Sequence, residues 1–389
     1  MSSTHTHRNV DVTESSPLIH EPTTRQSLQR IVKASWVNVL LVFIPLGFIA
    51  HFLKWGDTAV FLLNFFAIIP LAKLLGFATE DIALRTGQTI GALLNATFGN
   101  AVELIIAIIA LKEGQIRVVQ ASVMGSIISN LLLVLGCCFL AGGLKYQVQE
   151  FNETAAQTSA SLMALACIAL IIPAAFSVSI PATQDYEIIN LSHYTAIVLL
   201  VVYGLYLLFQ LKTHTELYLT EDEDEQEPEL TLPVAMLLLA GVTVIVAVCG
   251  DFLVSSIEGI TESLGLTKTF VGLILLPIVG NAAEHVTAIT VAMKNKMQLA
   301  IGVAAGSSLQ IALFVTPFLV VLGWIIDQPM TLFFEVFETV LLFVSVLIMN
   351  YLIQDGKSNW LEGALLLATY IIIAIAFYFY PDPVSEAPA

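Results

Sequence analysis

Gly99-Asn100-Ala101-Val102-Glu103 and Gly280-Asn281-Ala282-Ala283-Glu284 are near-copies of each other, separated by 181 residues along the chain. Each copy places one glutamate inside an otherwise apolar run. A charged side chain at membrane depth costs from about 3 to more than about 10 kcal/mol, so such residues usually mark an ion path or a proton relay. The paired glutamates therefore predict a protein that moves cations across a membrane.

The composition indicates a chain embedded in a lipid bilayer. Hydrophobic residues make up 57% of its 389 residues, charged residues only 12%, and the mean hydropathy is +0.86. Soluble domains carry about 25% charged residues. The net charge of −16 comes in large part from one acidic segment, residues 216–229, and gives no reason to expect a nucleic-acid partner. The four cysteines lie in apolar stretches without metal or disulfide spacing, and we expect them to be buried small hydrophobes.

Long apolar runs set the expected fold. A helix of about 20 apolar residues crosses the hydrocarbon core of a bilayer, and we find eleven such runs. We therefore expect an all-α polytopic membrane protein with eleven transmembrane helices. The expected spans lie near residues 34–53, 57–75, 89–111, 117–141, 155–176, 191–211, 231–250, 270–292, 298–323, 330–353 and 360–380. Residues 1–33 are rich in Ser, Thr, His and Pro, which predicts a disordered tail without a cleavable signal peptide.

The basic residues indicate an orientation in the membrane. With the amino terminus in the cytosol, most lysines and arginines face the cytosol, as the positive-inside rule requires. Those expected on the other side are Lys54, Lys112, Arg117 and Lys268. We therefore expect residues 1–33 to be cytosolic and residues 381–389 to form a lumenal tail.

The duplicated motif predicts an inverted repeat. Residues 57–212 and 231–380 each contain five expected spans, and an odd number of crossings turns the second copy upside down. Gly125-Ser126 aligns with Gly306-Ser307 at the same offset, as in a true internal duplication. Inverted repeats build alternating access around a site at the middle of the membrane. The helix at 34–53 is then an extra amino-terminal span.

An acidic linker, residues 213–230, separates the two expected repeats. Its charges are concentrated in Glu221, Asp222, Glu223, Asp224 and Glu225. Such a segment can be a solvated tether between the two halves. It can also collect or sense divalent cations with low affinity, because carboxylate clusters allow this without a fixed geometry.

The two motifs supply hard oxygen ligands. Asn100 and Glu103 are three residues apart, as are Asn281 and Glu284, so each pair projects from one helix face. Gly99 and Gly280 are poor helix formers, and broken helices expose backbone carbonyls. Carboxylate, amide and carbonyl oxygens suit Ca²⁺, and they serve Mn²⁺ less selectively. No cysteine or histidine cluster argues for zinc or copper.

A second polar stripe follows each motif. Its members are Ser126, Ser129 and Asn130 after the first motif, and Ser307, Ser308 and Gln310 after the second. Small residues can serve only to let transmembrane helices approach closely. The amides need hydrogen-bond partners in hydrocarbon, so we expect them to order the glutamates or to complete the shell of a bound ion.

Protons and Ca²⁺ compete for the oxygens of a buried glutamate. Competition at one alternately exposed site is antiport. His285, directly after Glu284, could accept a proton, although adjacent residues on a helix point in different directions. Glu80 and Asp81 can pair with Arg85 at helical spacing, in an interfacial helix that could also collect cations.

Five motifs in order resemble one known family. They are Ala78-Thr79-Glu80 with Leu84-Arg85, the run Leu94 to Leu104, Gly125-Ser126 through Asn130, Gly280 to His285, and Gly306 to Gln310. Together they resemble the CAX family of vacuolar cation/proton exchangers, over nearly the whole chain after the tail. The resemblance implies eleven transmembrane helices, an acidic cytosolic helix between two five-helix repeats, and Ca²⁺ and proton binding by Glu103 and Glu284. It also implies a multi-pass protein of the vacuolar membrane.

The expected function is secondary active exchange of lumenal protons for cytosolic Ca²⁺, not an enzymatic reaction. No prosthetic group is expected, and Ca²⁺ is the transported ion and a candidate regulator. The expected partners are Ca²⁺, H⁺ and the lipid bilayer, with self-association into a homo-oligomer left open. Exchange of Ca²⁺ for Na⁺ on the same architecture, a passive cation channel, and a membrane sensor that uses the acidic linker are the alternatives.

Overall fold

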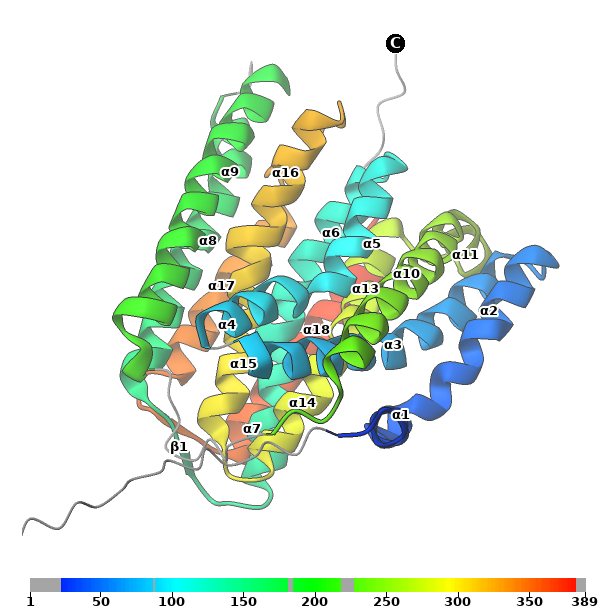
Figure 1. The fold of residues 1–389 in the computed structure, drawn as a ribbon. Coiled ribbons are helices and arrows are strands. Elements are labelled where there is room, and N and C mark those ends of the chain that lie inside the picture. Colours follow the sequence, from blue (N-terminus) through cyan, green and yellow to red (C-terminus); the bar gives the residue numbers. More distant parts are fainter. Residues whose placement is uncertain (1–21, 87, 181–184, 218–226, 383–389) are drawn as a thin grey trace, which may run out of the picture.

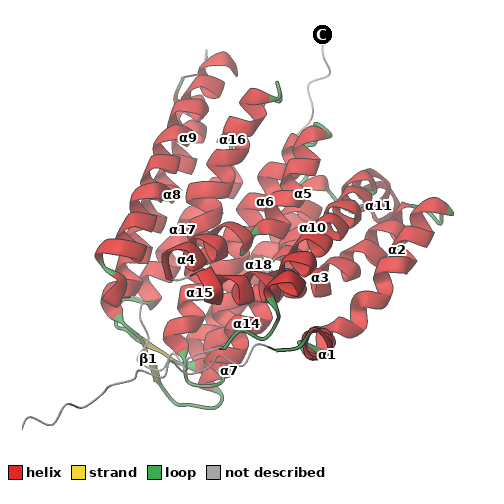
Figure 2. Cartoon of the chain, in the orientation of Figure 1, coloured by secondary structure: helices red, strands yellow, loops and turns green. Residues whose placement is uncertain are grey.

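The computed structural model describes residues 22–86, 88–180, 185–217 and 227–382. This part of the chain is mostly helical, with its long helices packed side by side (Figures 1 and 2). Seven of the described helices are long and apolar enough to cross a membrane, or up to nine if each of two bent pairs is one span. The expected all-α membrane class is confirmed.

The described elements follow one another in chain order. In the first half they are α1 (Thr24–Lys33), the 3₁₀-helix η1 (Trp36–Val42), α2 (Phe43–Phe52), α3 (Asp57–Thr86), α4 (Gln88–Phe98), α5 (Ala101–Lys112), α6 (Ile116–Ile128), the π-helix η2 (Ser129–Val134), α7 (Leu135–Gly143), β1 (Gln149–Glu150), α8 (Glu153–Ser179), α9 (Asp185–Leu208), the π-helix η3 (Phe209–Thr213) and the 3₁₀-helix η4 (Thr215–Leu217).

The second half contains two further π-helices, η5 and η6. Its elements are α10 (Leu232–Ser255), α11 (Ile257–Leu264), α12 (Lys268–Phe270), η5 (Val271–Leu275), α13 (Leu276–Gly280), α14 (Ala282–Ala292), α15 (Met297–Gln310), η6 (Ile311–Val315), α16 (Thr316–Ile325), α17 (Val336–Leu352), β2 (Lys357–Ser358) and α18 (Trp360–Phe379).

Helix α1 corrects the expectation of a disordered tail over the whole of residues 1–33. A capping box begins it, in which Thr23 and Gln26 satisfy each other's backbone N–H groups. Arg30 also donates a 2.9 Å hydrogen bond to the carbonyl of Glu229. Leu28 and Val32 are exposed on this helix, and the next helical segment lies at 90° to it. These local caps and contacts order a segment whose composition is polar.

Several expected spans have different limits in the structure. Helix α3 continues to residue 86, eleven residues beyond the expected end, although Gly76 lies in its interior. The expected span 89–111 is two helices, and the expected span 330–353 begins only at residue 336, after an extended segment. Glycine and asparagine at position 99–100 account for the break, because neither favours a helix interior.

Both duplicated motifs interrupt a helix at the asparagine. Asn100 separates α4 from α5 with φ −104° and ψ 27°, and Asn281 separates α13 from α14 with φ −83° and ψ 3°. Each asparagine precedes the first turn of a helix, where backbone N–H groups lack intrahelical acceptors. The breaks therefore bring two helix amino-terminal ends into the protein interior.

Two of the π-helices follow these breaks at corresponding places. η2 begins at Ser129 and joins α6 to α7, and η6 begins at Ile311 and joins α15 to α16. π-Helical turns are rare and occur often at functional sites. Gly125 on α6 packs against the backbone carbonyl of Leu273 in η5. Any side chain at position 125 would collide with the backbone of η5.

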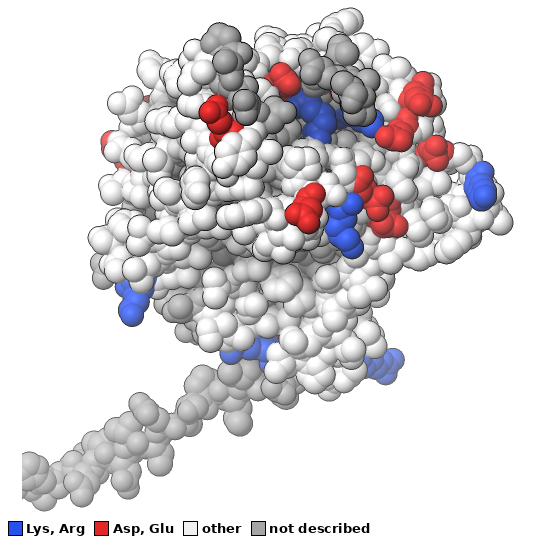
Figure 3. All heavy atoms as spheres, turned by 90° about the horizontal axis from the view of Figure 1, so that it is seen from above, with Lys and Arg blue, Asp and Glu red and all other residues white. Residues whose placement is uncertain are grey.

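The described chain has two opposite faces. The α1 face carries α1 and the antiparallel pair of β1 and β2, in which Gln149 pairs with Ser358, whereas the chain leaves α18 at the opposite face (Figure 1). On that opposite face acidic and basic side chains lie together (Figure 3), and Lys268 Nζ lies 2.7 Å from a Glu258 carboxylate oxygen.

Candidate ion-binding site

Glu103 and Glu284 both lie in the first turn of a helix that begins inside the protein. Glu103 is the third residue of α5, and Glu284 is the third residue of α14. The amino-terminal end of a helix carries partial positive charge, so it favours a carboxylate there. The sequence thus positions the two acids through the asparagine breaks that precede them.

Polar atoms without partners gather at these breaks. Within the described chain, both carboxylate oxygens of Glu103, both amide atoms of Asn281 and Oε2 of Glu284 are buried without a hydrogen bond. The hydroxyl of Ser129 and Oδ1 of Asn130 are also buried without a hydrogen-bond partner among the described residues. Because buried polar groups nearly always have partners, this set is suited to an ion bound through oxygen.

The carboxylate of Glu103 reaches across to the other duplicated motif. A Cβ atom added to Gly280 would lie 2.8 Å from Glu103 Oε1, so the acid rests directly against the backbone of that glycine. Gly99 has no such contact with Glu284, since its nearest atom is the carbonyl of Asn95. The two motifs therefore meet asymmetrically in this conformation.

A chain of hydrogen bonds joins the polar stripes of the two halves. Asn130 Nδ2 donates to Ser307 Oγ at 2.9 Å, Ser307 Oγ donates to Asn100 Oδ1 at 2.8 Å, and Asn100 Nδ2 donates to Gln310 Oε1 at 2.5 Å. These four residues were predicted from their spacing, and the structure brings them together. The network fixes the orientation of amides beside the glutamates.

The remaining predicted residues of the stripe have different surroundings. Ser126 and Ser129 are buried in α6 and at the start of η2. Ser308 is also buried, but its hydroxyl donates to the carbonyl of Ala304 at 3.0 Å, so it satisfies its own helix. His285 has a buried Nε2 without a partner among the described residues, yet it does not line the cavity described next.

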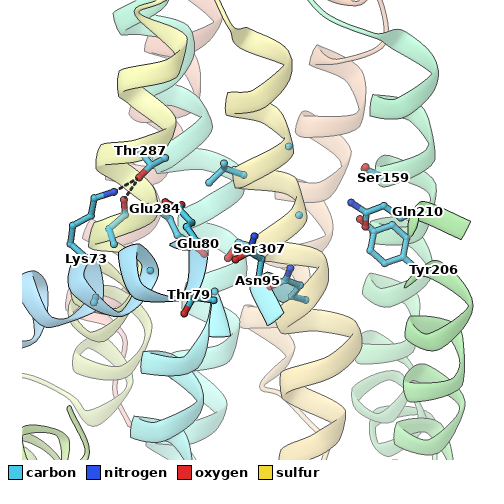
Figure 4. A pocket seen from close by; sticks show the side chains of 18 residues that line it. Lys73, Thr79, Glu80, Asn95, Ser159, Tyr206, Gln210, Glu284, Thr287 and Ser307 are labelled. Atoms are coloured by element: carbon cyan, nitrogen blue, oxygen red, sulfur yellow. Dashed lines mark hydrogen bonds between the residues drawn. The ribbon is translucent and has the colours of Figure 1, made fainter. Parts of the chain in front are cut away.

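A cavity of about 320 Å³ leads to Glu284 (Figure 4). Its lining residues come from α3, α4, α8, α14 and α15 and from the end of the α9–η3 segment; those with polar side chains are Lys73, Thr79, Glu80, Asn95, Ser159, Tyr206, Gln210, Glu284, Thr287, Ser307 and Gln310. Ser159 and Gln210 lie near the ends of α8 and α9–η3 at the α1 face. The cavity therefore connects Glu284 with the α1 face, and Glu103 is not among its lining residues.

Glu80 and Asp81 are adjacent on α3 but contact different parts of the protein. Glu80 lines the cavity, whereas Asp81 is 3% exposed and accepts hydrogen bonds from the backbone N–H groups of Glu229 and Leu230. Arg85 lies 3.5 Å from Asp81, as its helical spacing predicted, and also donates to the carbonyl of Leu230. The acidic residues 221–225 lie outside the described residues.

Lys73 and Thr287 line this cavity but were not predicted from the sequence. Lys73 was assigned to the cytosolic flank because α3 was expected to end near residue 75. The signal that could have found it is the same one that found the glutamates, a lone charge inside a long apolar helix. Thr287 lies three residues after Glu284, on the same face of α14.

On the opposite face, a buried ion pair joins α6 to α17. Arg117 at the start of α6 binds Glu338 of α17, with Nη1 3.0 Å from Oε2, and its Nε donates to Thr269 Oγ1 at 3.1 Å. Thr269 in turn donates to Asp382 at 2.7 Å. Glu338 is fully buried. This network links three helices and the end of the described chain on the side away from the cavity.

The chemistry of the donors narrows the kind of ion. The described residues contain no group of three or more His, Cys, Asp and Glu side chains that could hold a metal. A cation at this site would draw on two carboxylates together with amide, hydroxyl and backbone oxygens. That donor set suits a hard cation such as Ca²⁺ rather than zinc or copper.

Comparisons with known proteins agree with this geometry. The family model described as "Sodium/calcium exchanger protein" matches residues 57–212 and 234–379. The chain is 52% identical over 357 residues to a vacuolar calcium ion transporter of Schizosaccharomyces pombe, a match that covers 90% of this chain and 87% of the relative. It is 53% identical over 361 residues to a Ca(2+)/H(+) antiporter of Aphanothece halophytica, covering 88% and 96%.

Solved structures show the same fold. The native structure of YfkE superposes with a TM-score of 0.78 at 40% identity, covering 88% of this chain and all of that one. The crystal structure of an H+/Ca2+ exchanger, CAX, superposes with a TM-score of 0.69 at 13% identity, covering 92% and 89%, and shows the fold alone. The resemblance found from the motifs is thereby confirmed, and the chain belongs to the sodium/calcium exchanger protein family.

Proposed function

We propose that this protein is a secondary active antiporter that exchanges H⁺ for Ca²⁺ across the vacuolar membrane. The observation that carries the proposal is the pair of glutamates, one from each duplicated motif: both carboxylate oxygens of Glu103 and Oε2 of Glu284 are buried without a protein partner in the described chain. The names of the relatives, a vacuolar calcium ion transporter and a Ca(2+)/H(+) antiporter, support the same ions and location.

The mechanism is competition for one set of oxygens. Ca²⁺ enters through the cavity, meets Glu284 first, and is shared with Glu103 when the two motifs close around it. Protons that bind the carboxylates from the other side displace the ion. Hydrogen bonds among Asn100, Ser307 and Gln310 orient the amide and hydroxyl groups that would surround the bound ion. Mn²⁺, which accepts the same ligands, is a second transported ion.

The proposed architecture is eleven membrane spans, with two inverted five-helix repeats after an extra first helix. Three observations support it. The family model matches twice, over residues 57–212 and 234–379. Both motifs break a helix at the asparagine, and the π-helices η2 and η6 follow at corresponding positions. Alternating access then results from exchange of the roles of the two halves.

The α1 face is proposed to be cytosolic, so that the cavity receives cytosolic Ca²⁺. The distribution of lysines and arginines supports this orientation. A pH difference of two units supplies roughly 2.7 kcal/mol per proton, and a thousandfold Ca²⁺ gradient requires about 4.1 kcal/mol. Two or more protons per Ca²⁺ therefore suffice, apart from the electrical term.

The test is Ca²⁺ uptake into sealed proteoliposomes with an acid interior and no sodium. We expect uphill uptake that collapses with a protonophore and is abolished by Glu103→Gln and by Glu284→Gln, which keep the shape but remove the charge. Glu262→Gln, at an exposed glutamate, is the matched control and should transport normally. Uptake that requires sodium inside the vesicles would instead establish Na⁺/Ca²⁺ exchange, and downhill flux alone would establish a channel.

A further inference from the structure

One basic side chain lines the cation cavity. Lys73 lies in the interior of α3, between Asp57 at its start and Thr86 at its end, and is half-buried. Its Nζ donates a 3.0 Å hydrogen bond to Thr287 Oγ1 on α14 (Figure 4). A fixed positive charge on the route of a cation opposes the passage of that cation unless it has a specific role.

The position of Thr287 brings the ammonium close to the ion-binding acid. Thr287 and Glu284 are three residues apart on α14, and both line the same cavity. One helical turn rises 5.4 Å. The lysine ammonium has three donors on a flexible four-carbon stem, and Thr287 uses one of them. The residue that holds Nζ is therefore within one helical turn of Glu284, and both side chains line the cavity.

A second acid of the cavity is within electrostatic reach of the same ammonium. Glu80 lies seven residues after Lys73, two turns further along α3 and on the same side of that helix. Both side chains line the cavity, and Lys73 attracts the charge of Glu80. Lys73 is thus placed to neutralise the carboxylates that an arriving Ca²⁺ would meet.

We propose that Lys73 is a tethered competitor of the transported cation. While the cavity contains no Ca²⁺, the ammonium of Lys73 is held by Thr287 and offsets the negative charge of Glu284 and Glu80; Ca²⁺ that binds these acids must overcome its positive charge. Lys73 thereby sets a low apparent affinity for Ca²⁺ at the α1 face. This inference rests on the proposed function, because it assumes that Glu284 binds the transported ion.

The rival role for Lys73 is structural, as a hydrogen-bonded tie between α3 and α14. Three substitutions separate the two roles. Lys73→Gln retains a donor for Thr287 and removes the charge, Lys73→Arg retains the charge, and Thr287→Val removes the acceptor alone. Lys294→Gln is the matched control, since Lys294 is exposed at the α1 face outside the cavity.

The experiment measures initial rates of proton-driven Ca²⁺ uptake with Ca²⁺ varied at the α1 face of oriented proteoliposomes. Loss of a unit charge from the cavity should lower the KM of Lys73→Gln for Ca²⁺ by roughly tenfold, because the repulsion of a divalent ion is removed. The maximal rate should change far less, Lys73→Arg should restore the wild-type KM, and Lys294→Gln should leave KM unchanged. An unchanged KM in Lys73→Gln, or the same KM decrease in Thr287→Val, would overturn the proposal.

A binding measurement covers a variant that does not transport. Calorimetric titration of Ca²⁺ into the purified Lys73→Gln protein should give about tenfold tighter binding than wild type, and equal or weaker binding would overturn the proposal. Absence of proton-driven uptake in the wild type would refute the proposed function itself. In that case the titration still tests the competition between Lys73 and Ca²⁺.

Discussion

Glu103 touches the backbone at the point where the opposite motif breaks its helix, and this contact requires a glycine. At Gly280 the space that a Cβ atom would fill is taken by Glu103 Oε1, 2.8 Å away. The acid and the glycine come from different motifs and are 177 positions apart. Glu103 is therefore held in place by the shape of the opposite motif.

Gly280→Ala should displace Glu103 and lower the rate of Ca²⁺ transport by about tenfold to a hundredfold, because a shift of about 1 Å in a ligand is enough for such a loss. Gly241→Ala in α10 is the control, since nothing lies within 4 Å of the Cβ that it would add. Uptake assays at matched protein content provide the measurement. Normal transport by Gly280→Ala would show that the close contact is not needed.

The residues of the site that could be predicted were those with a repeated spacing. The glutamates, Asn100, Ser307 and Gln310 follow from the duplicated motif, and the structure joins the last three in one hydrogen-bonded chain. Lys73 has no counterpart in the repeat and lies at the end of an expected span. Its part in the cavity depends on the true length of α3, which composition alone does not give.

At the scale of elements, side-chain hydrogen bonds connect both ends of α3 to neighbouring segments. Asp81 on α3 accepts hydrogen bonds of 2.6 and 2.8 Å from the backbone just before α10. Thr58 at the other end of α3 is 2.8 Å from Ser263 of α11. Helix α3 is thus tied at both faces to the segment that contains α10 and α11.

Asp81→Ala should destabilise the protein by about 1.5 to 3 kcal/mol, because it leaves two backbone N–H groups without their charged acceptor. Asp81→Asn keeps an acceptor oxygen and should lose less. The midpoint of thermal unfolding in detergent is the measurement, and Asp251→Ala, at an exposed aspartate, is the control. Equal midpoints for Asp81→Ala and wild type would contradict the role of this contact.

Glu338→Ala should cost about 3 to 5 kcal/mol, because it leaves the guanidinium of Arg117 largely buried and unpaired. Glu258→Ala removes an exposed ion pair with Lys268 and should change stability by no more than about 1 kcal/mol. Unfolding titrations of the two variants under the same conditions compare them directly. A similar loss in both would mean that burial of the Arg117 pair adds nothing.

Hydrophobic runs predicted where the helices are, but not where they break or widen into π-helical turns. The apolar runs mark most of the long helices, since burial in lipid depends mainly on composition. The π-helices η2 and η6 leave composition unchanged, so hydropathy contains no trace of them. Helix α1 arises from a capping box and contacts with residues 229–231, which act over distances that a local pattern cannot reveal.

For the whole molecule, the two faces differ in access to the interior: a cavity lies toward the α1 face, and a hydrogen-bonded ion-pair network lies at the opposite face. The cavity joins Glu284 to the α1 face, while the network of Arg117 and Glu338 fastens the helices at the opposite face. Glu103 lies apart from the cavity, so the two acids differ in access although their motifs are alike. This is the arrangement expected of a carrier that is open to one side.

The Ser159→Cys variant should therefore react with a membrane-impermeant thiol reagent added from the α1 face and much more slowly with the same reagent added from the other face. The four native cysteines would first be replaced, and Ser345→Cys, at a buried serine of α17, is the control that should not react. Labelling followed by mass measurement gives the rates. Equal rates from both faces would contradict the sidedness of the cavity.

The matching π-helices also bear on ancestry. π-Helical turns are rare, and η2 and η6 contain such turns at corresponding positions. Under the proposed duplication, one irregular helix in a half-length ancestral gene explains both. That ancestor already carried its irregular helix before the genes fused. Under the same proposal, copies of that half-length ancestor would have had to enter the membrane in both orientations and pair there.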